Sequence, residues 1–210
     1  METNNLKDIN ITLTDDKISI FEKYTRIFLE TNSKLNLISK NDEKVLFEKH
    51  IYDSLALNLF LTPKKNESLL DIGTGGGFPA VPLAIYYENL NITALDSIRK
   101  KINAVENIKQ NLNLVNLTTI CTRVENFDKN FDYVTSRAVA SLDKILEYGM
   151  AKLKKGGYFI AYKSKKYEEE LLTAKKTISK YKLKPPKIIT YKLPLEEVYE
   201  RNLIIFQKPF

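Results

Sequence analysis

Apolar and polar residues alternate in two different ways along the chain from residue 64 onward. Short apolar runs bounded by polar or turn residues predict strands, and between them apolar residues recur at helical spacing. This alternation predicts an α/β fold with a mostly parallel sheet and helices on both faces. Since no helix separates the last two strands, we expect them to form an antiparallel pair at one edge. The predicted strands are 68–72, 91–95, 117–121, 131–135, 157–162, 187–191 and 202–207, and the predicted helices are 79–87, 98–112, 141–153 and 165–181.

The segment before residue 64 has a helical pattern only. Residues 1–13 are polar and are expected to be loose. Thr14, followed by two acidic residues, predicts the start of a helix that runs to about residue 30. A second helix is predicted over 43–61. We therefore expect an N-terminal helical cap, 1–63, and a main domain, 64–210.

The turn after the first predicted strand is rich in glycine. Gly73, Gly75 and Gly77 permit positive φ and leave no Cβ where a ligand approaches the backbone. A dinucleotide-binding fingerprint has its third glycine at position 78, where this chain has Phe78, so a dehydrogenase is the least favoured function. The glycines are instead spaced as D-x-G-x-G-x-G, which resembles motif I of S-adenosylmethionine (SAM)-dependent methyltransferases. This resemblance implies the class I fold, a Rossmann-like seven-stranded sheet with an antiparallel edge strand, and SAM as methyl donor.

Three further residues are candidates for binding SAM. Asp96 follows the second strand, 19 residues after Gly77, and an acid near this offset accepts hydrogen bonds from ribose hydroxyls in doubly wound folds. The alternative is that Asp96 caps the next helix. Val124 and Glu125 follow the third strand, where backbone meets an adenine edge; for Glu125 the alternative is a surface salt bridge.

Two basic residues at strand ends are the candidate catalytic residues. Arg137 ends the fourth strand, where it could bind the SAM carboxylate, an RNA phosphate or guanine O6. Its structural alternative is a pair with a nearby acid or a helix C-terminus. Lys163 ends the fifth strand and is the second candidate; its alternative is an ordinary surface lysine.

Residues that are absent after the fourth predicted strand limit which atom can accept the methyl group. It is not followed by the Pro-Pro-aromatic sequence typical of adenine amino-group methylation, and the single cysteine, Cys121, lies inside a predicted strand, which disfavours a covalent intermediate. An acceptor that is already nucleophilic remains. Guanine N7 fits, because its lone pair lies in the ring plane and no proton is removed, so catalysis reduces to positioning.

Charge and composition limit the partners. The net charge is +7, yet residues 152–192 hold 13 Lys against 3 Glu, a net of +10. A basic half of this kind is typical of nucleic-acid binders, although a merely Lys-rich surface is the alternative. No apolar run reaches the roughly 18 residues of a membrane span. One Cys and one His disfavour a metal site and suit the cytoplasm. No long apolar seam indicates a dimer, so we expect a monomer.

Two motifs are more specific than the glycine turn. They are His50-x-x-Asp53-Ser54-Leu55 and Ser136-Arg137-Ala138-Val139-Ala140. With the glycine turn they resemble the RsmG (GidB) family of small-subunit rRNA guanine-N7 methyltransferases. The resemblance implies 16S rRNA of the small ribosomal subunit as substrate, and it leaves the roles of His50, Asp53 and Ser54 open. The residues that it implies as SAM contacts are Gly73, Phe78, Val124, Glu125 and Arg137.

Two functions of other kinds remain as alternatives. A methyltransferase for a small molecule or a protein would not need the basic half. An RNA-binding assembly factor could keep the fold and lose turnover.

Overall fold

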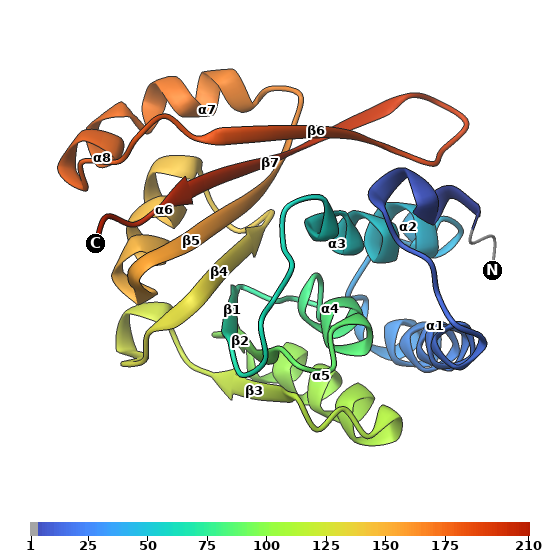
Figure 1. Ribbon diagram of the computed structural model, residues 1–210. Coiled ribbons are helices and arrows are strands. Elements are labelled where there is room, and N and C mark those ends of the chain that lie inside the picture. The colour runs from blue at the N-terminus through green and yellow to red at the C-terminus, as the bar shows by residue number, and fades with distance from the viewer. Residues whose placement is uncertain (1–3) are drawn as a thin grey trace.

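A seven-stranded sheet organises the computed structural model, which describes residues 4–210 (Figure 1). The strand order is β3-β2-β1-β4-β5-β7-β6, and β1 to β5 run parallel. β7 runs antiparallel to both β5 and β6. The expected antiparallel pair at the edge is therefore confirmed, with β7 as the reversed strand and β6 at the edge. The strands are β1 (Ser68–Ile72), β2 (Asn91–Asp96), β3 (Leu117–Cys121), β4 (Phe131–Arg137), β5 (Leu153–Ser164), β6 (Lys187–Leu193) and β7 (Tyr199–Gln207).

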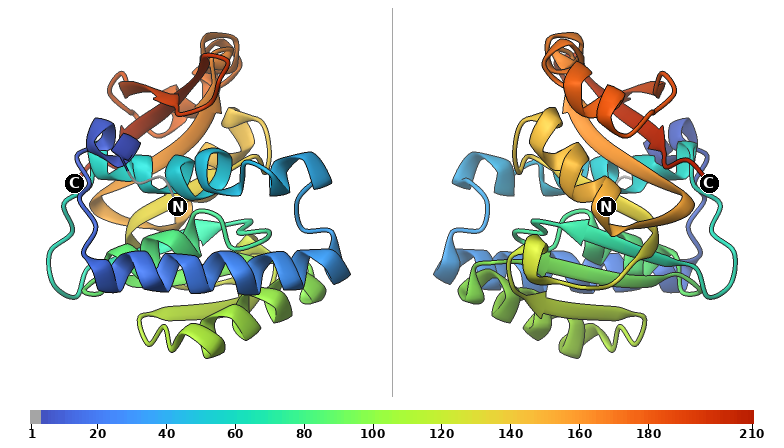
Figure 2. Two further views of the ribbon diagram at one scale, coloured as in Figure 1. Left: turned by 90° about the vertical axis from the view of Figure 1, so that its right-hand side faces the viewer. Right: turned by 90° about the vertical axis from the view of Figure 1, so that its left-hand side faces the viewer.

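Helices cover both faces of the sheet. α1 packs beside α4 and α5 on one face (Figure 2), and α6, α7 and α8 pack together on the other. Neighbouring residues of β1 point to opposite faces, so Leu69 joins one hydrophobic cluster and Leu70 the other. The helix predicted over 165–181 is divided into two. The helices of these layers are α1 (Asp15–Leu35), α4 (Ala80–Tyr86), α5 (Arg99–Leu112), α6 (Leu142–Lys152), α7 (Tyr167–Thr173) and α8 (Lys175–Lys180).

The N-terminal segment differs from the sequence prediction in three places. α1 begins after Thr14 as predicted but continues to Leu35 instead of ending near residue 30. Residues 4–13 are not loose, because η1 (Asn4–Ile9) is a 3-10 helix and Leu6, Ile9 and Ile11 are buried; the part of that prediction on residues 1–3 lies outside the described residues. The second helix is not regular either. It consists of α2 (Lys40–Glu43), the π-helical η2 (Phe47–Tyr52), α3 (Asp53–Leu55) and the 3-10 helix η3 (Ala56–Leu59).

The N-terminal helices and the sheet share one hydrophobic core. Phe21 and Phe28 of α1 belong to the same buried cluster as Leu69 of β1 and Ile205 of β7. The Phe28 and Phe78 rings meet edge to face with centroids 5.0 Å apart. Through Phe78 this core extends to the glycine-rich turn, so the first helix supports the residues at the carboxyl ends of the strands.

Candidate functional site

The glycine-rich turn leaves the carboxyl end of β1 and is tied to the next strand. The backbone N–H groups of Gly73 and Thr74 both donate to the carbonyl of Leu95, over 2.7 and 3.0 Å. Gly73, Gly75 and Gly77 all have positive φ, as the sequence predicts. A Cβ at Gly75 would meet no atom nearer than 3.9 Å, so open space faces that residue.

Gly77 serves packing rather than ligand access. A Cβ at this position would stand 2.7 Å from Cγ2 of Val81 on α4. Its φ of +95° is also costly for residues with a side chain. Gly77 lines neither of the two cavities described below.

Asp96 braces the turn against the next helix. Its carboxylate accepts a hydrogen bond from Gly75 N–H over 3.0 Å and another from Ile98 N–H over 2.9 Å. α5 begins at Arg99 with Ile98 as its N-cap residue, so Asp96 holds the approach to the helix without being its cap residue. A carboxylate offers about four lone-pair sites, so two backbone donors leave room for ligand hydroxyls.

A cavity of about 410 Å³ lies beside this carboxylate. Asp96, Val124 and Glu125 all line it, together with Gly73 of the turn. Hydrogen bonds from the backbone N–H of Glu125 and from Tyr148 lower the pKa of the Glu125 carboxyl. Three of the sequence-predicted residues are thus brought together at the carboxyl ends of β2 and β3.

A second cavity, of about 330 Å³, adjoins the first. Gly73, Lys101 and Ala138 line both, which makes the turn the boundary between them. The second cavity is rich in cationic side chains, with one acid among its lining residues. The charged residues that line it are Lys49, Lys101, Arg137, Arg201 and Asp53.

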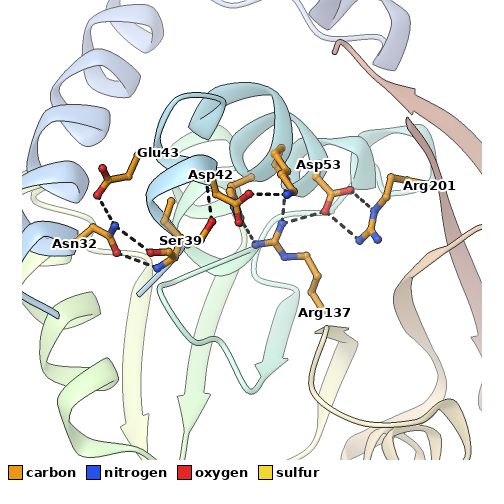
Figure 3. A network of polar contacts seen from close by, with 10 residues as sticks. Asn32, Ser39, Asp42, Glu43, Asp53, Arg137 and Arg201 are labelled. Carbon is orange, nitrogen blue, oxygen red and sulfur yellow. Dashed lines mark hydrogen bonds and ion pairs between the residues drawn. The ribbon is translucent and has the colours of Figure 1, made fainter. Parts of the chain in front are cut away.

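Arg137 lines this second cavity, and three side chains hold its guanidinium. Figure 3 shows its pair with Asp53. Its Nη1 donates to Oδ2 of Asp53 over 3.0 Å, and its Nη2 donates to Nδ1 of His50 over 2.8 Å. The guanidinium stands 5.1 Å from the centre of the Phe78 ring, within reach of a cation–π interaction. The Arg137 side chain is 12% exposed, so it faces the cavity from a fixed position.

Asp53 is the centre of this network. It is 1% exposed and also accepts two hydrogen bonds from Arg201 of β7, over 3.0 and 3.2 Å, and one from Tyr191 of β6 over 2.6 Å. Burial raises the pKa of the Asp53 carboxyl, but Arg201 and Arg137 outweigh burial and hold the pKa below its usual range. Sequence reasoning singled out Asp53 but missed Arg201 and Tyr191, which carry no local signal.

His50 is a neutral acceptor in the same network. Burial, with the Arg137 charge as a second cause, lowers its pKa to about 4. Arginine donates hydrogen bonds and does not accept them, so Nδ1 of His50 is unprotonated and the proton is on Nε2. Nε2 lies 3.5 Å from Oδ2 of Asp42. His50 and Asp53, one helical turn apart, therefore both hold Arg137.

Lys163 lies outside both cavities. Its Nζ pairs with Oε2 of Glu170 over 2.6 Å and donates to the Ala140 carbonyl over 3.2 Å. The same Glu170 oxygen accepts the N–H of Leu142 at the start of α6. The structure thus does not bring Lys163 together with Arg137; it joins α7 to the start of α6 instead.

Neither a metal site nor a cysteine nucleophile is found at the two cavities in the described part of the chain. Residues 4–210 contain no group of three or more His, Cys, Asp or Glu side chains placed to hold a metal ion. Cys121 lies at the end of β3, with its sulfur 3.8 Å from the Ser97 carbonyl, and lines neither cavity. None of the helices in this range is both long and apolar enough to cross a membrane.

Solved structures with the same architecture are SAM-dependent methyltransferases. A SAM-dependent O-methyltransferase from Thermotoga maritima aligns with a TM-score of 0.56 and 15% identity, over 82% of this chain and 66% of that one. The tRNA methyltransferase TrmI from Aquifex aeolicus aligns with a TM-score of 0.58 and 14% identity, over 78% and 69%. These similarities confirm the predicted class I methyltransferase fold.

Sequence relatives are more specific. The ribosomal RNA small subunit methyltransferase G of Staphylococcus aureus (strain JH9) is 39% identical over 208 residues, which cover 97% of this chain and 87% of the relative. The family model described as rRNA small subunit methyltransferase G matches residues 17–203. The resemblance found in the sequence is thereby confirmed, and the chain belongs to the GidB family of rRNA small subunit methyltransferases.

Proposed function

We propose that this protein transfers a methyl group from SAM to N7 of a guanine in 16S rRNA of the small ribosomal subunit. The observation that carries the proposal is the pair of adjoining cavities that meet at Gly73, one with an acid at its wall and the other rich in cations. The names of the sequence relatives support the substrate. Since ribosomes are its target, the protein acts in the cytoplasm, and we propose that it acts as a monomer.

The first cavity fits the adenosine part of SAM. Asp96 would accept hydrogen bonds from the ribose hydroxyls, since its carboxylate keeps lone pairs beyond the two backbone donors. Val124 and Glu125 would lie along the adenine.

The second cavity fits the methionine part. Gly75 leaves the backbone open on that side, and Arg137 would pair with the carboxylate beside Phe78. Bound SAM supplies an electrophilic methyl group on its sulfonium. Gly77 supports this site only through packing against α4.

The acceptor is best explained as an atom that needs no activation. Cys121 lines neither cavity, and the Nδ1 lone pair of His50 is already used by Arg137. Guanine N7 needs neither a nucleophile nor a base, so the protein has to position it in line with the methyl group. We propose that Arg137 is the catalytic residue that does so from the cavity. Lys163 would then act as a positioning residue that fixes α6 and α7 through Glu170.

The test is transfer of labelled methyl from SAM to small ribosomal subunits that lack the modification, followed by cleavage mapping of N7-methylguanine. We expect label at one guanine of 16S rRNA. Absence of label on rRNA, with SAM binding intact in a parallel titration, would contradict the proposed substrate and leave the SAM site standing. Label at another atom of a nucleotide would contradict the N7 assignment alone.

A further inference from the structure

A third cavity lies at the opposite end of the sheet from the candidate site. It has a volume of about 540 Å³ and lies where β5 begins and β7 ends. The carboxyl ends of the parallel strands, which hold the candidate site, are at the other end of the sheet. The C-terminal segment continues from β7 toward this end of the sheet (Figure 1).

Aromatic rings form part of its wall. Phe60 and Tyr158 meet edge to face with centroids 5.2 Å apart. Phe210 is 90% exposed, and its ring lies so close to the backbone of Gly156 that a Cβ there would stand 2.6 Å from it. An exposed aromatic ring held on backbone is a stacking surface for a planar ligand.

The segment that carries Phe210 is fixed to the sheet. Gly156 N–H donates to the Lys208 carbonyl over 3.0 Å, and Lys208 N–H donates to the Gly157 carbonyl over 2.8 Å. The Lys208 Nζ donates to the carbonyls of Met150 and Leu153 over 2.8 and 2.7 Å. The Lys208 ammonium group is therefore occupied by backbone carbonyls, and Lys208 forms part of the cavity wall without offering its charge to a ligand.

Three other lysines supply the charge. Lys182, Lys184 and Lys187 are exposed and line the cavity, and Nζ of Lys187 stands 5.6 Å from the centre of the Phe60 ring. None of the residues that line the cavity is acidic. Cations interleaved with aromatic rings favour an anionic ligand with planar groups.

We infer that this third cavity binds a single-stranded segment of RNA, with a base on Phe210 and backbone phosphates on Lys182, Lys184 and Lys187. The inference rests on the proposed function, since rRNA is then the partner that brings such a segment. It gives the protein two RNA contacts at opposite ends of its sheet. The second contact would add affinity without touching the reacting base.

The first experiment measures binding of unmodified 16S rRNA over a range of salt concentrations. Each phosphate contact to a single strand contributes about 0.7 to the slope of log affinity against log salt, so replacing all three lysines by Ala should lower the slope by about 2. The matched control replaces three other lysines by Ala, Lys34, Lys65 and Lys129, which are exposed and lie outside this cavity. We expect the control to keep the slope within one contact of the unaltered protein, and SAM affinity to stay unchanged in both.

A second pair of variants tests stacking. Phe210→Leu keeps the apolar volume and removes the ring, so rRNA binding should weaken about fivefold or more, whereas Phe210→Tyr should bind as the unaltered protein does. The ring is exposed, so neither change should alter the unfolding midpoint.

Three results would overturn the inference. Equal salt slopes in the triple-lysine variant and the control would show that these three lysines do not contact phosphates. Losses seen with assembled subunits and not with bare 16S rRNA would make the partner a protein. Failure of the unaltered protein to bind rRNA would overturn it too, and only if mapped methylation of rRNA is also missing would the proposed function fall with it.

Discussion

Asp53 joins three segments that are far apart along the chain. It is buried between Arg137 of β4 and Arg201 of β7 (Figure 3), and it also accepts a hydrogen bond from Tyr191 of β6. Two guanidinium groups share this single carboxylate. Removing one partner from a buried charge network leaves the others unpaired, which costs about 3–5 kcal/mol.

The positioning role of Asp53 can be separated from its role in stability. Asp53→Asn should lower the free energy of unfolding by about 3–5 kcal/mol because two cations remain. Adding Arg201→Gln removes one of them, so the double variant should regain much of that stability. The double variant should still transfer the methyl group slowly, because Arg137 no longer pairs with the Asp53 carboxylate. Urea unfolding and single-turnover methyl transfer measure the two quantities.

Arg201→Gln alone is the control for this prediction, since Asp53 still holds Arg137 in it. We expect its methyl transfer to exceed that of the double variant by tenfold or more, on the order of 1.4 kcal/mol. If the double variant and Arg201→Gln are equally active, Asp53 does not position Arg137.

His50 makes the free energy of unfolding decrease as the pH falls below about 6.5. Its folded pKa of about 4 is lower than the 6.5 of an unperturbed histidine, mainly because of burial. Its neutral form is therefore favoured in the fold, and this contribution is full above about pH 6.5 and is lost as the pH falls toward 4. The loss amounts to at most about 3 kcal/mol.

We expect His50→Gln, which keeps an acceptor for Arg137, to flatten the stability curve between pH 7 and pH 4.5. Urea unfolding at a series of pH values tests this. Parallel curves for the variant and the unaltered protein would show that His50 does not carry the proton linkage.

At the scale of the element, the glycine-rich turn separates ligand access from packing. Gly75 faces open space and Gly77 faces Val81. Gly75→Asp should abolish SAM binding, because an acidic side chain would fill the second cavity, which Gly75 lines, while aspartate tolerates positive φ. Gly77→Ala should instead destabilise the fold by about 1–3 kcal/mol through overpacking.

SAM titration and thermal unfolding of both variants measure this contrast. Normal SAM affinity in Gly75→Asp would remove the turn from the proposed cofactor site. A Gly77→Ala variant as stable as the unaltered protein would show that the Val81 contact is relieved at little cost.

The sequence predicts the strands better than the segment between α1 and the sheet. Short apolar runs locate every strand, and β1 and β3 have the predicted bounds. The segment 43–61 is different because residues 51–57 are all buried, which leaves no polar face to show a helical period. In the structure η2 packs against β6, α3 against α4 and η3 against η1, and no local sequence pattern records these contacts.

The candidate site is predictable where it depends on position and not where it depends on pairing. Asp96, Val124 and Glu125 follow neighbouring parallel strands, so their place in one cavity follows from the sheet order. Two partners of Asp53, Tyr191 and Arg201, come from strands that the β6–β7 pairing brings side by side. Lys163 has a favourable strand-end position, but Glu170 seven residues later pairs with it.

At the scale of the whole molecule, the basic C-terminal segment contributes residues to the third cavity and pairs with a strand that contributes to the second. The net charge of +7 is concentrated in residues 152–192, which run from the end of α6 through β6. This segment contains three lysines of the third cavity and lies next in space to β7, which carries Arg201. The proposed attraction of rRNA and the network around Asp53 thus both use the C-terminal part of the chain.

The shared core predicts that the chain unfolds as one unit, although the sequence predicts a helical cap, 1–63, and a main domain, 64–210. Phe28 of α1 is fully buried and contacts Phe78, whose ring supports Arg137. Phe28→Ala should therefore cost about 3–5 kcal/mol and shift the unfolding of helices and sheet together.

Far-UV circular dichroism and tyrosine fluorescence, with 12 Tyr and no Trp in the chain, should report the same midpoint for this variant. Leu172→Ala on α7 is the control, because that side chain is 60% exposed and its loss should leave the midpoint unchanged. Separate transitions would mean that α1 detaches while the sheet stays folded. Phe78 would then keep Arg137 in place without α1, and SAM affinity would survive the first transition. A single transition would instead make the first helix a condition for the site, since Phe28 and Phe78 would lose their contact only when the whole core opens.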